Sequence, residues 1–427
     1  MILRPTAVLS MFLYALCAYA QDDVLPQPPV ILDHADSVVG SGPVDAGRRE
    51  FLGNVRFRQG NVTVTCDRAV HDIFANRLDL RGRVVIVQDG MKLTAPVVIY
   101  DGNSTLASAP NGCVVVEGGR TIRSKTATYS TTRKVAVFVD SVRVVDDSMR
   151  IWADTVTYDR QTKMSEARGR ALLADSSGHR WTFGDTIVYN PSQSSLFVRG
   201  NAQAWTIEDE DTTYLAGSVL RTYRNVGIEG NTSIASGSAI LVRGNVAARA
   251  DTMVYDEHRG VVNLRAQPIV WNDSLQMFAD SIDINAPARK LSSILGIGSA
   301  MLVSRSDTLF PDRYDQLAGE RITITVDDDT VRKVVSVGQA KSVTWKSEQG
   351  RGEGMVKFAS DSIEMDFEDG QPVDIRWLGS IEGEHHPENI VAGRVAEHLL
   401  KGFQWHTDRP KRLPLPRPFL PGSGADM

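Results

Sequence analysis

Apolar and polar residues alternate in short runs along most of this chain. In residues 141–144 the two valines share one parity, and Ser141 and Arg143 share the other. A period of two is typical of a β-strand that buries one face. Turn-forming Asp-Gly pairs, as at residues 89–90 and 369–370, separate such runs. The pattern therefore predicts short antiparallel strands joined by tight turns.

A longer pattern repeats on top of this alternation. Each copy opens with Gly-x-Val-x-apolar and continues through apolar-x-Ala-Asp-Ser/Thr to Tyr-Asp. The copies open at Gly53, Gly82, Gly112, Asp140, Gly169, Gly200, Gly230, Ala266, Gly298, Gly338 and Gly379. The first six gaps run between 28 and 31 residues, and the later four between 32 and 41. The chain therefore contains about ten two-strand units, which must stack to bury their apolar faces.

Two positions within each copy indicate a local feature of the backbone. Glycine opens most copies, although Asp140 and Ala266 take its place in two of them. This preference predicts a tight turn or a β-bulge. The recurring aspartates of the Ala-Asp motif are predicted to bond backbone at a strand bend or to face solvent. They are Asp67, Asp154, Asp251 and Asp280.

The two ends of the chain differ from the repeats. Residues 1–20 resemble a cleavable signal peptide, because a positive residue, an apolar run and a small-x-small site follow one another. Residues 21–50 are predicted to be an extended leader. The regular repeats occupy residues 51–230, and stretched repeats with insertions occupy residues 231–385. Residues 386–427 are predicted to form a C-terminal cap helix, within residues 388–402, and a solvated Pro-rich tail.

Composition narrows the classes of function. The chain has 427 residues and a net charge of −5, which argues against a nucleic acid partner. Beyond the signal peptide it holds two cysteines, Cys66 and Cys113. These lie on opposite parities of their strands, so we expect two free, packed thiols rather than a disulfide.

The sequence shows no arrangement typical of a catalytic or metal site. The eight histidines have no metal-ligand spacing, and no phosphate-binding loop or nucleophile elbow is present. We therefore expect a protein that is not an enzyme and that uses no cofactor. A β-helical enzyme acting on envelope polysaccharide is a further alternative. It would need shorter rungs and clustered carboxylates on one face, and the sequence shows no such cluster.

The repeated motifs resemble those of the organic-solvent-tolerance family, the OstA/LptA-like periplasmic proteins of lipopolysaccharide transport. The resemblance covers residues 53 to about 383 and includes residues 250–256, Ala-Asp-Thr-Met-Val-Tyr-Asp. It implies an all-β fold, an elongated, open-ended, taco-like β-jellyroll of twisted antiparallel strands. It also implies a periplasmic protein whose apolar groove shields the acyl chains of lipopolysaccharide or a related glycolipid. The expected partners are inner-membrane and outer-membrane transport components and further copies head to tail, joined by pairing of edge strands.

The apolar parity of the early units supplies the candidate groove lining. From the first strands the candidates are Val55, Phe57, Val84, Ile86, Val114, Val116, Val142, Val144, Ala171 and Leu173. From the second strands they are Val62, Val64, Met91, Leu93, Met149, Ile151 and Phe183. Parity does not separate an open groove from a closed, dry core. The alternative function, a structural or adaptor β-solenoid of the cell envelope without lipid cargo, therefore stays open.

Overall fold

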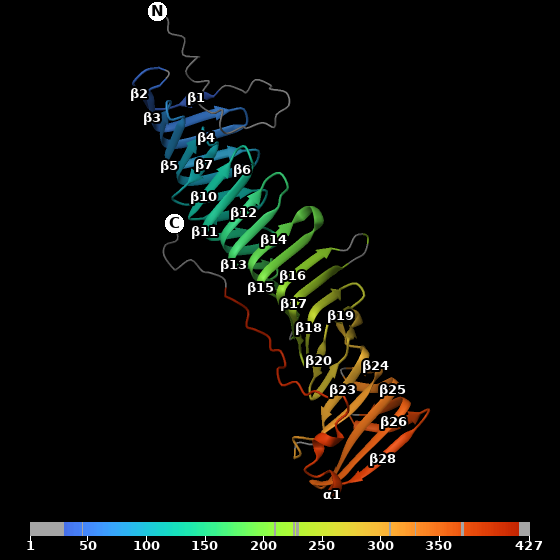
Figure 1. Ribbon diagram of the computed structural model, residues 1–427. Helices are drawn as coiled ribbons and strands as arrows, with labels where there is room; N and C mark the ends of the chain where they lie inside the picture. The colour runs from blue at the N-terminus through green and yellow to red at the C-terminus, as the bar shows by residue number, and fades with distance from the viewer. Residues whose placement is uncertain are drawn as a thin grey trace, which may run out of the picture. The chain divides into compact units, whose positions relative to one another are not determined.

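The computed structural model describes residues 30–417 except 45, 209–210, 225–226, 228–229, 307–308, 329 and 369–370. The predicted signal peptide and residues 21–29 of the leader lie outside the described residues. The chain divides into two compact units (Figure 1). Unit 1 holds the described residues up to Val198 together with Pro416 and Arg417, and unit 2 runs Arg199–Leu415. The boundary at residue 230 between regular and stretched repeats stays a prediction.

Unit 1 is built almost entirely from strands. They are β1 (Ile31–His34), β2 (Ser37–Ser41), β3 (Arg48–Gln59), β4 (Val62–Asp72), β5 (Arg77–Gln88), β6 (Met91–Asp101), β7 (Leu106–Ala109), β8 (Cys113–Glu117), β9 (Arg120–Ser124), β10 (Thr126–Ser130), β11 (Val135–Val145), β12 (Met149–Asp159), β13 (Ser165–Asp175) and β14 (Arg180–Asn190). A 3-10 turn, η1 (Pro191–Gln193), leads into β15 (Ser195–Glu208), which crosses the boundary between the units.

Unit 2 continues the same kind of structure. Its strands are β16 (Asp211–Arg224), β17 (Asn231–Arg243), β18 (Val246–Asp256), β19 (Val261–Arg265), β20 (Ile269–Asn272), β21 (Leu275–Phe278), β22 (Ser281–Asn285), β23 (Ser293–Arg305), β24 (Tyr314–Asp327), β25 (Thr330–Glu348), β26 (Arg351–Glu368), β27 (Gln371–Leu378) and β28 (Glu382–Pro387). Three short helical turns complete the described elements: η2 (Pro287–Arg289), α1 (Glu388–Val391) and η3 (Val395–His398).

Consecutive long strands pair as antiparallel hairpins. In β3 to β6, Phe57 lies opposite Val64, Val64 opposite Ile86, and Ile86 opposite Leu93. Residues directly opposite one another share a face of the sheet, so these four side chains form one apolar row. The predicted all-β class, with two antiparallel strands per unit, is confirmed.

The repeating glycines mark β-bulges in the middle of strands rather than turns between them. The register shifts between Leu52 and Val55 in β3 and between Arg81 and Val84 in β5. Gly53 and Gly82 lie at these shifts with φ +72° each, a conformation that favours glycine. Each long strand therefore bends, and its two halves belong to two walls. The wall that contains residues 48–52 of β3 is called the first wall, and the wall that contains residues 55–59 is called the second wall. The line of bulges between them is the spine.

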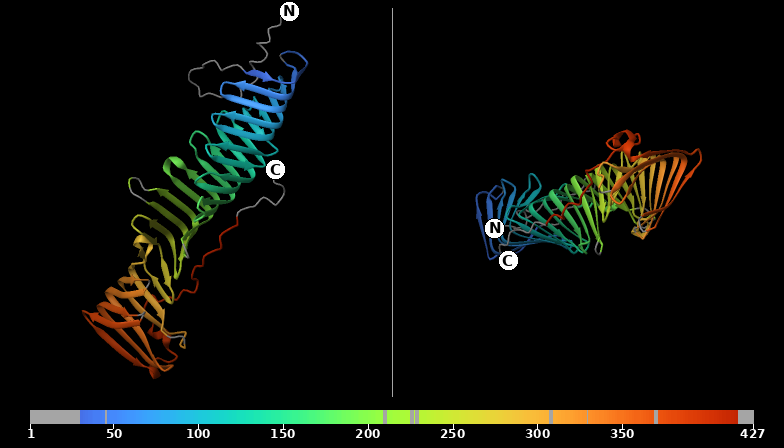
Figure 2. Two further views of the ribbon diagram at one scale, coloured as in Figure 1. Left: turned by 180° about the vertical axis from the view of Figure 1, so that it is seen from behind. Right: turned by 90° about the horizontal axis from the view of Figure 1, so that it is seen from below.

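The two walls fold over one another and bury one face of each. Phe51 of the first wall and Phe57 of the second meet edge to face, with ring centroids 5.2 Å apart. This contact identifies the inner face, which carries Phe57 and the residues opposite it in the row above. In unit 2, the right-hand view of Figure 2 shows the strands folded into a wedge. The inner faces of both walls form the main core of each unit.

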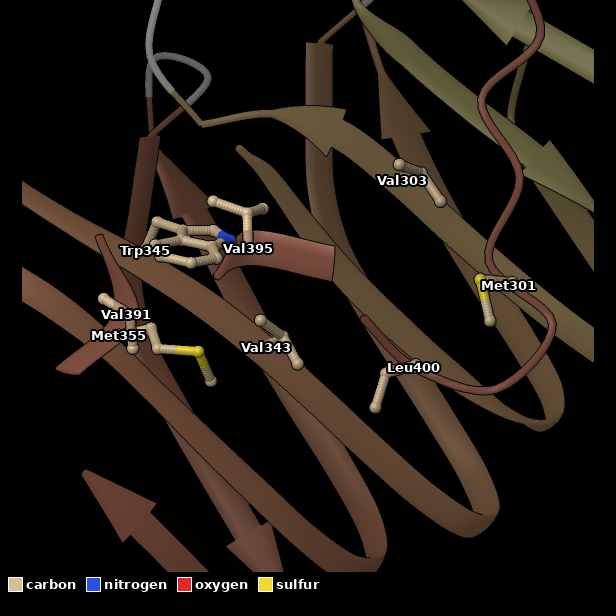
Figure 3. Packing of buried hydrophobic residues seen from close by; sticks show 8 residues of the cluster. All are labelled: Met301, Val303, Val343, Trp345, Met355, Val391, Val395 and Leu400. Carbon is tan, nitrogen blue, oxygen red and sulfur yellow. The ribbon is translucent and has the colours of Figure 1, made fainter. Parts of the chain in front are cut away.

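In unit 2 the chain returns over the outer face of the second wall. The C-terminal segment, residues 388–415, starts with α1 and packs Val391, Val395 and Leu400 onto this face (Figure 3). There they meet Val343 and Met355, and the whole group forms a second hydrophobic core outside the sheet. The outer position of α1 is visible in the right-hand view of Figure 2.

The predicted cap helix over residues 388–402 is wrong. Only a single helical turn forms at α1. Gly393, at φ +76°, interrupts the helical conformation before η3 begins. The apolar residues of this stretch nevertheless pack as a group. The tail that follows is anchored by hydrogen bonds, although residues 411–414 are exposed to solvent. Trp205 Nε1 donates a hydrogen bond to Leu413 O, and Arg409 donates to Asn245 O.

Candidate functional site

The inner face of the second wall in unit 1 holds most of the predicted lining residues. The hairpin registers place the following on this face: Val55, Phe57, Val62, Val64, Val84, Ile86, Met91, Leu93, Val142, Val144, Met149, Ile151, Ala171 and Leu173. They come from β3–β6 and β11–β13. Val115 of β8, opposite Leu93, and Ile122 of β9, opposite Val144, connect the two groups, so the side chains form a continuous apolar surface along the unit. This surface is the candidate functional site.

Val114 and Val116 do not belong to the inner face, and their prediction is corrected. Val115 lies opposite both Leu93 and Ile122, which puts Val115 inward and its two neighbours outward. Val116 is accordingly 40% exposed. The reason is a break in the strand, because residues 110–112 separate β7 from β8. In the other repeats of unit 1 that open with glycine, the second residue after it faces inward, whereas here the first one does, namely Cys113 after Gly112. The inward residues here are Cys113, Val115 and Ile122, which the sequence pattern missed.

Phe183 is also corrected to the outer face. In β14 the inward positions are Thr182, opposite Leu173, and Gly184, opposite Ala171. Phe183 lies opposite Leu172 and joins a separate outer cluster. That cluster contains Trp152, Leu172, Ala174, Trp181 and Phe183. Its hydrophobic character led to the wrong parity, because here both faces of the sheet carry apolar side chains.

From β5 onwards in unit 1, exposure of the inner face increases from the spine towards the hairpin ends, whereas Gln59 and Val62 at the end of the β3–β4 hairpin are buried. Val84 and Ala171, next to the bulges, are fully buried. Met91, Leu93 and Leu173, near the hairpin turns of the second wall, are half-buried. Deep positions are thus closed to water, and positions near the turns that follow β5 are partly open. We call the line where the hairpin ends of the two walls face one another the mouth.

Burial favours the uncharged forms of three titratable side chains on the inner face. Burial raises the pKa of the Cys66 thiol to about 11, and it also raises the pKa of Cys113. Both thiols are free and buried, as predicted. Their predicted opposite parities were wrong, however, because Cys113 faces inward with Val115. Burial lowers the pKa of His71, on the first wall, to about 4.

The repeated aspartates lie along the spine and fix the bulges. Asp280 N donates a hydrogen bond to Gly298 O, and Asp251 N donates to Ala266 O. In unit 1 the carboxylates also pair with the residue after the bulge glycine, as Asp67 does with Arg83 at 2.6 Å. The hydrogen bond from Arg83 lowers the pKa of the Asp67 carboxyl. These contacts agree with the predicted structural role at a strand bend.

The mouth of unit 1 is polar and is bridged by side chains from both walls. Glu117, at the end of β8 in the second wall, accepts a hydrogen bond of 2.9 Å from Arg160 Nη2. Arg160 belongs to the turn after β12 in the first wall. Beside this pair, Arg120 of the second wall lies over the ring of Tyr158 of the first, 5.6 Å from its centroid. No sequence pattern indicated that these residues would meet.

Two further classes of site are not found in the described part of the chain. No group of three or more His, Cys, Asp or Glu side chains lies close enough together to hold a metal ion among those residues. None of the described helices has the length and hydrophobicity needed to cross a membrane.

Comparisons with known proteins give two family matches. Residues 27–176 match the family model described as OstA-like protein. Residues 121–290 match the one described as LptA/(LptD N-terminal domain) LPS transport protein. Neither description names an enzymatic activity. No curated protein matches the chain.

Several solved structures are similar to part of the chain. One of them is the crystal structure of LptH, the LptA homologous periplasmic component of the conserved lipopolysaccharide transport device from Pseudomonas aeruginosa. The sequence identity is 17% and the TM-score 0.26. The similarity covers 33% of this chain and 95% of that one.

Proposed function

Since residues 27–290 belong to the OstA/LptA-like family of lipopolysaccharide transport proteins, we propose that this chain carries lipopolysaccharide, or a related glycolipid, through the periplasm. The acyl chains lie against the inner face of the β-jellyroll, and the cargo moves towards the outer membrane for its assembly. The protein performs this carriage without catalysis and without a cofactor.

The observation that carries this proposal is the continuity of the apolar inner face. Phe57, Ile86 and Leu93 share one row across neighbouring hairpins, and Val144 and Ile151 extend the same face further along unit 1. Burying an acyl chain yields roughly 25 cal/mol for each Å² of apolar surface removed from water. Such a surface therefore holds hydrocarbon by area alone, with no need for a chemical step.

The gradient of exposure supports an amphiphilic cargo in particular. Residues at the spine are buried, whereas Met91 and Leu93 near the mouth are half-buried. Beyond them, the mouth carries charged groups such as Glu117 and Arg160. A glycolipid matches this order, because its acyl chains seek the apolar depth and its polar headgroup stays at the mouth.

Partners are proposed at the two ends of the sheet. In the described part of the chain, β1 and β2 each pair with β3 alone, and β27 and β28 each pair with β26 alone. The other edge of each of these strands presents backbone donors and acceptors that can pair with another chain. We propose that inner-membrane and outer-membrane transport components, or further copies head to tail, join there.

A cargo-free structural or adaptor solenoid is the second candidate. The contact between Phe51 and Phe57, with centroids 5.2 Å apart, favours it, because the two walls touch at this point. Lipid carriage requires the walls to separate at such contacts. The two functions therefore differ in whether the inner face ever meets a ligand.

A matched pair of charge substitutions tests the proposal. Leu93 is half-buried on the inner face, whereas Val87, on the neighbouring strand of the same hairpin, is 41% exposed on the outer face. We expect Leu93→Asp to abolish capture of lipopolysaccharide by the purified protein and Val87→Asp to leave it unchanged. Thermal melting of both variants checks the fold. Equal capture by two folded variants contradicts carriage and supports the solenoid.

A further inference from the structure

The ion pair between Glu117 and Arg160 joins the two walls of unit 1 across the mouth. Glu117 ends β8, next to the hairpin turn at residues 118–119, so it sits at the outer limit of the second wall. Arg160 follows β12, in the turn that ends the first wall, and its backbone N–H donates to Lys134 O of the neighbouring turn. The guanidinium and the carboxylate are 2.9 Å apart. The contact therefore closes the gap between the walls at this position.

A second contact across the mouth lies beside the first. Arg120, which faces Glu117 across the β8–β9 hairpin, places its guanidinium 5.6 Å from the ring centroid of Tyr158. Tyr158 belongs to the first wall, on the strand that leads to Arg160. Arg120 also forms an ion pair of 3.2 Å with Asp146, which lies in the same wall. Two arginines, two carboxylates and one tyrosine thus meet at one place, and we call them the mouth cluster.

The Glu117–Arg160 pair is partly shielded from water but remains accessible. The side chains of Arg160 and Glu117 are 22% and 31% exposed. Burial lowers the pKa of Arg160, but hydrogen bonding to Tyr129 and the charge of Glu117 outweigh this, so its pKa is raised. Arg160 is therefore a permanent cation that either Glu117 or another anion can satisfy. An anion arriving from solvent can reach it.

The apolar inner face begins directly behind the mouth cluster. Val115 and Ile122 lie opposite one another one step inward along β8 and β9, and Val144 lies opposite Ile122. All three side chains are buried. A ligand entering here would meet a guanidinium first and an apolar surface immediately afterwards. This order matches an amphiphile with an anionic headgroup and a hydrocarbon chain.

We propose that Glu117 and Arg160 form a latch across the mouth, and that an anionic amphiphile opens it by replacing Glu117 as the partner of Arg160. This inference rests on the proposed carriage of lipid and adds the charge of the headgroup and the residue that receives it. The guanidinium fork binds phosphate and carboxylate oxygens through paired hydrogen bonds. Glu117, once released, turns to water at small cost because it is already partly exposed.

The test compares two amphiphiles with the same alkyl chain on the full-length protein. Dodecyl phosphate carries an anionic headgroup and dodecyl maltoside a neutral one, and each is used below the concentration at which it forms micelles. The variants are Glu117→Gln and Arg160→Gln. The controls are Glu166→Gln and Arg168→Gln, which remove an ion pair of 2.8 Å confined to the first wall. A further arm uses inorganic phosphate alone, to separate a headgroup from a free anion.

The latch predicts opposite effects of its two halves. Glu117→Gln frees Arg160 and should tighten dodecyl phosphate binding about ten-fold, whereas Arg160→Gln should weaken it by a similar factor. Both variants should bind dodecyl maltoside at least as well as the unmodified chain, because both lack the latch. The controls should change neither affinity. Inorganic phosphate should not compete at concentrations that saturate the site with dodecyl phosphate.

Several results would overturn the latch. Equal effects of the two variants on dodecyl phosphate would show that Arg160 does not receive the headgroup. Competition by inorganic phosphate at the same concentration would show a free-anion site instead. If neither substitution changes the affinity for either amphiphile, the latch is wrong but the proposed carriage of lipid still stands. Absence of binding by every folded variant would overturn carriage and the latch together.

Discussion

The carboxylate of Asp67 occupies the space beside Gly82 in which any larger residue would place its Cβ. Gly82 has φ +72°, and its strand bends there from the first wall to the second. The same arrangement recurs between Asp154 and Gly169. The aspartate of one strand and the glycine of the next are thus a matched pair that fixes the bend.

Replacement of Gly82 by alanine should destabilise unit 1 by about 1–3 kcal/mol, because it adds a collision with Asp67 to the backbone strain. Gly90→Ala is the matched control. Gly90 also has a positive φ, +81°, but nothing lies within 4 Å of the position of its Cβ. Its cost should be about 1 kcal/mol, from strain alone. Chemical denaturation measures both, and equal losses would show that the Asp67 contact contributes nothing.

This pairing shows how far the sequence could predict the fold. The alternation, the period and the Ala-Asp motif were sufficient to predict antiparallel two-strand units and aspartates at strand bends, because both depend on local backbone geometry. The parity of β8 could not be predicted, because residues 110–112 break the strand and shift the count. The error at Phe183 has another cause, since the outer cluster with Trp181 makes both faces apolar.

The free energy of unfolding of unit 1 should decrease as the pH falls, because of one buried histidine. His71 has a pKa of about 4 in the folded chain and 6.5 as its ordinary value. The unfolded chain therefore binds the extra proton first, so stability is constant above pH 6.5 and decreases as the pH falls from 6.5 to 4. The loss at this site amounts to at most about 3 kcal/mol.

The substitution His71→Tyr isolates this effect. Tyrosines occupy the corresponding positions in later units, at Tyr100 and Tyr158, so the side chain fits the fold pattern. Denaturation midpoints measured between pH 4 and 7 should depend less on pH in this variant than in the unmodified chain. An identical pH dependence of the two proteins would contradict the assignment.

The inner face should protect its thiols. Cys66 is buried and has a thiol pKa of about 11, so it has almost no thiolate at neutral pH. We expect neither Cys66 nor Cys113 to react with iodoacetamide in the native protein, and both to react quickly in denaturant. Mass spectrometry of the alkylated chain gives the count. Rapid alkylation of Cys66 in the native state would mean that the inner face is open to water at the spine.

The C-terminal segment should stabilise the outer face of unit 2. Gln276 donates a hydrogen bond to His406 O and accepts one from His406 N, at 2.8 and 2.9 Å. Gln276→Ala should therefore cost about 1–3 kcal/mol and speed hydrogen exchange in β21 and β23. Arg412→Ala, at an exposed position of the same segment, is the control. Unchanged exchange in both variants would show that the segment does not hold the wall.

The sequence predicted neither the docking of this segment on the outer face nor the mouth cluster. Gln276 and His406 are far apart in the chain, and no periodic pattern connects them. Glu117 and Arg160 likewise belong to different units of the repeat and meet only because the walls fold over one another. Contacts of this kind depend on the three-dimensional arrangement of side chains, whereas the inner-face residues follow from the alternation within each strand.

The central claim is that lipid contacts the inner face, and photo-crosslinking in cells tests it most directly. A photoreactive residue is placed at Ile86 or Val144, which face inward, and at Arg56 or Arg143, which lie on the opposite parity. The account predicts covalent glycolipid adducts at the inward positions and none at the outward ones. Adducts at the outward positions alone, or at none of the four in a folded protein, would contradict lipid carriage.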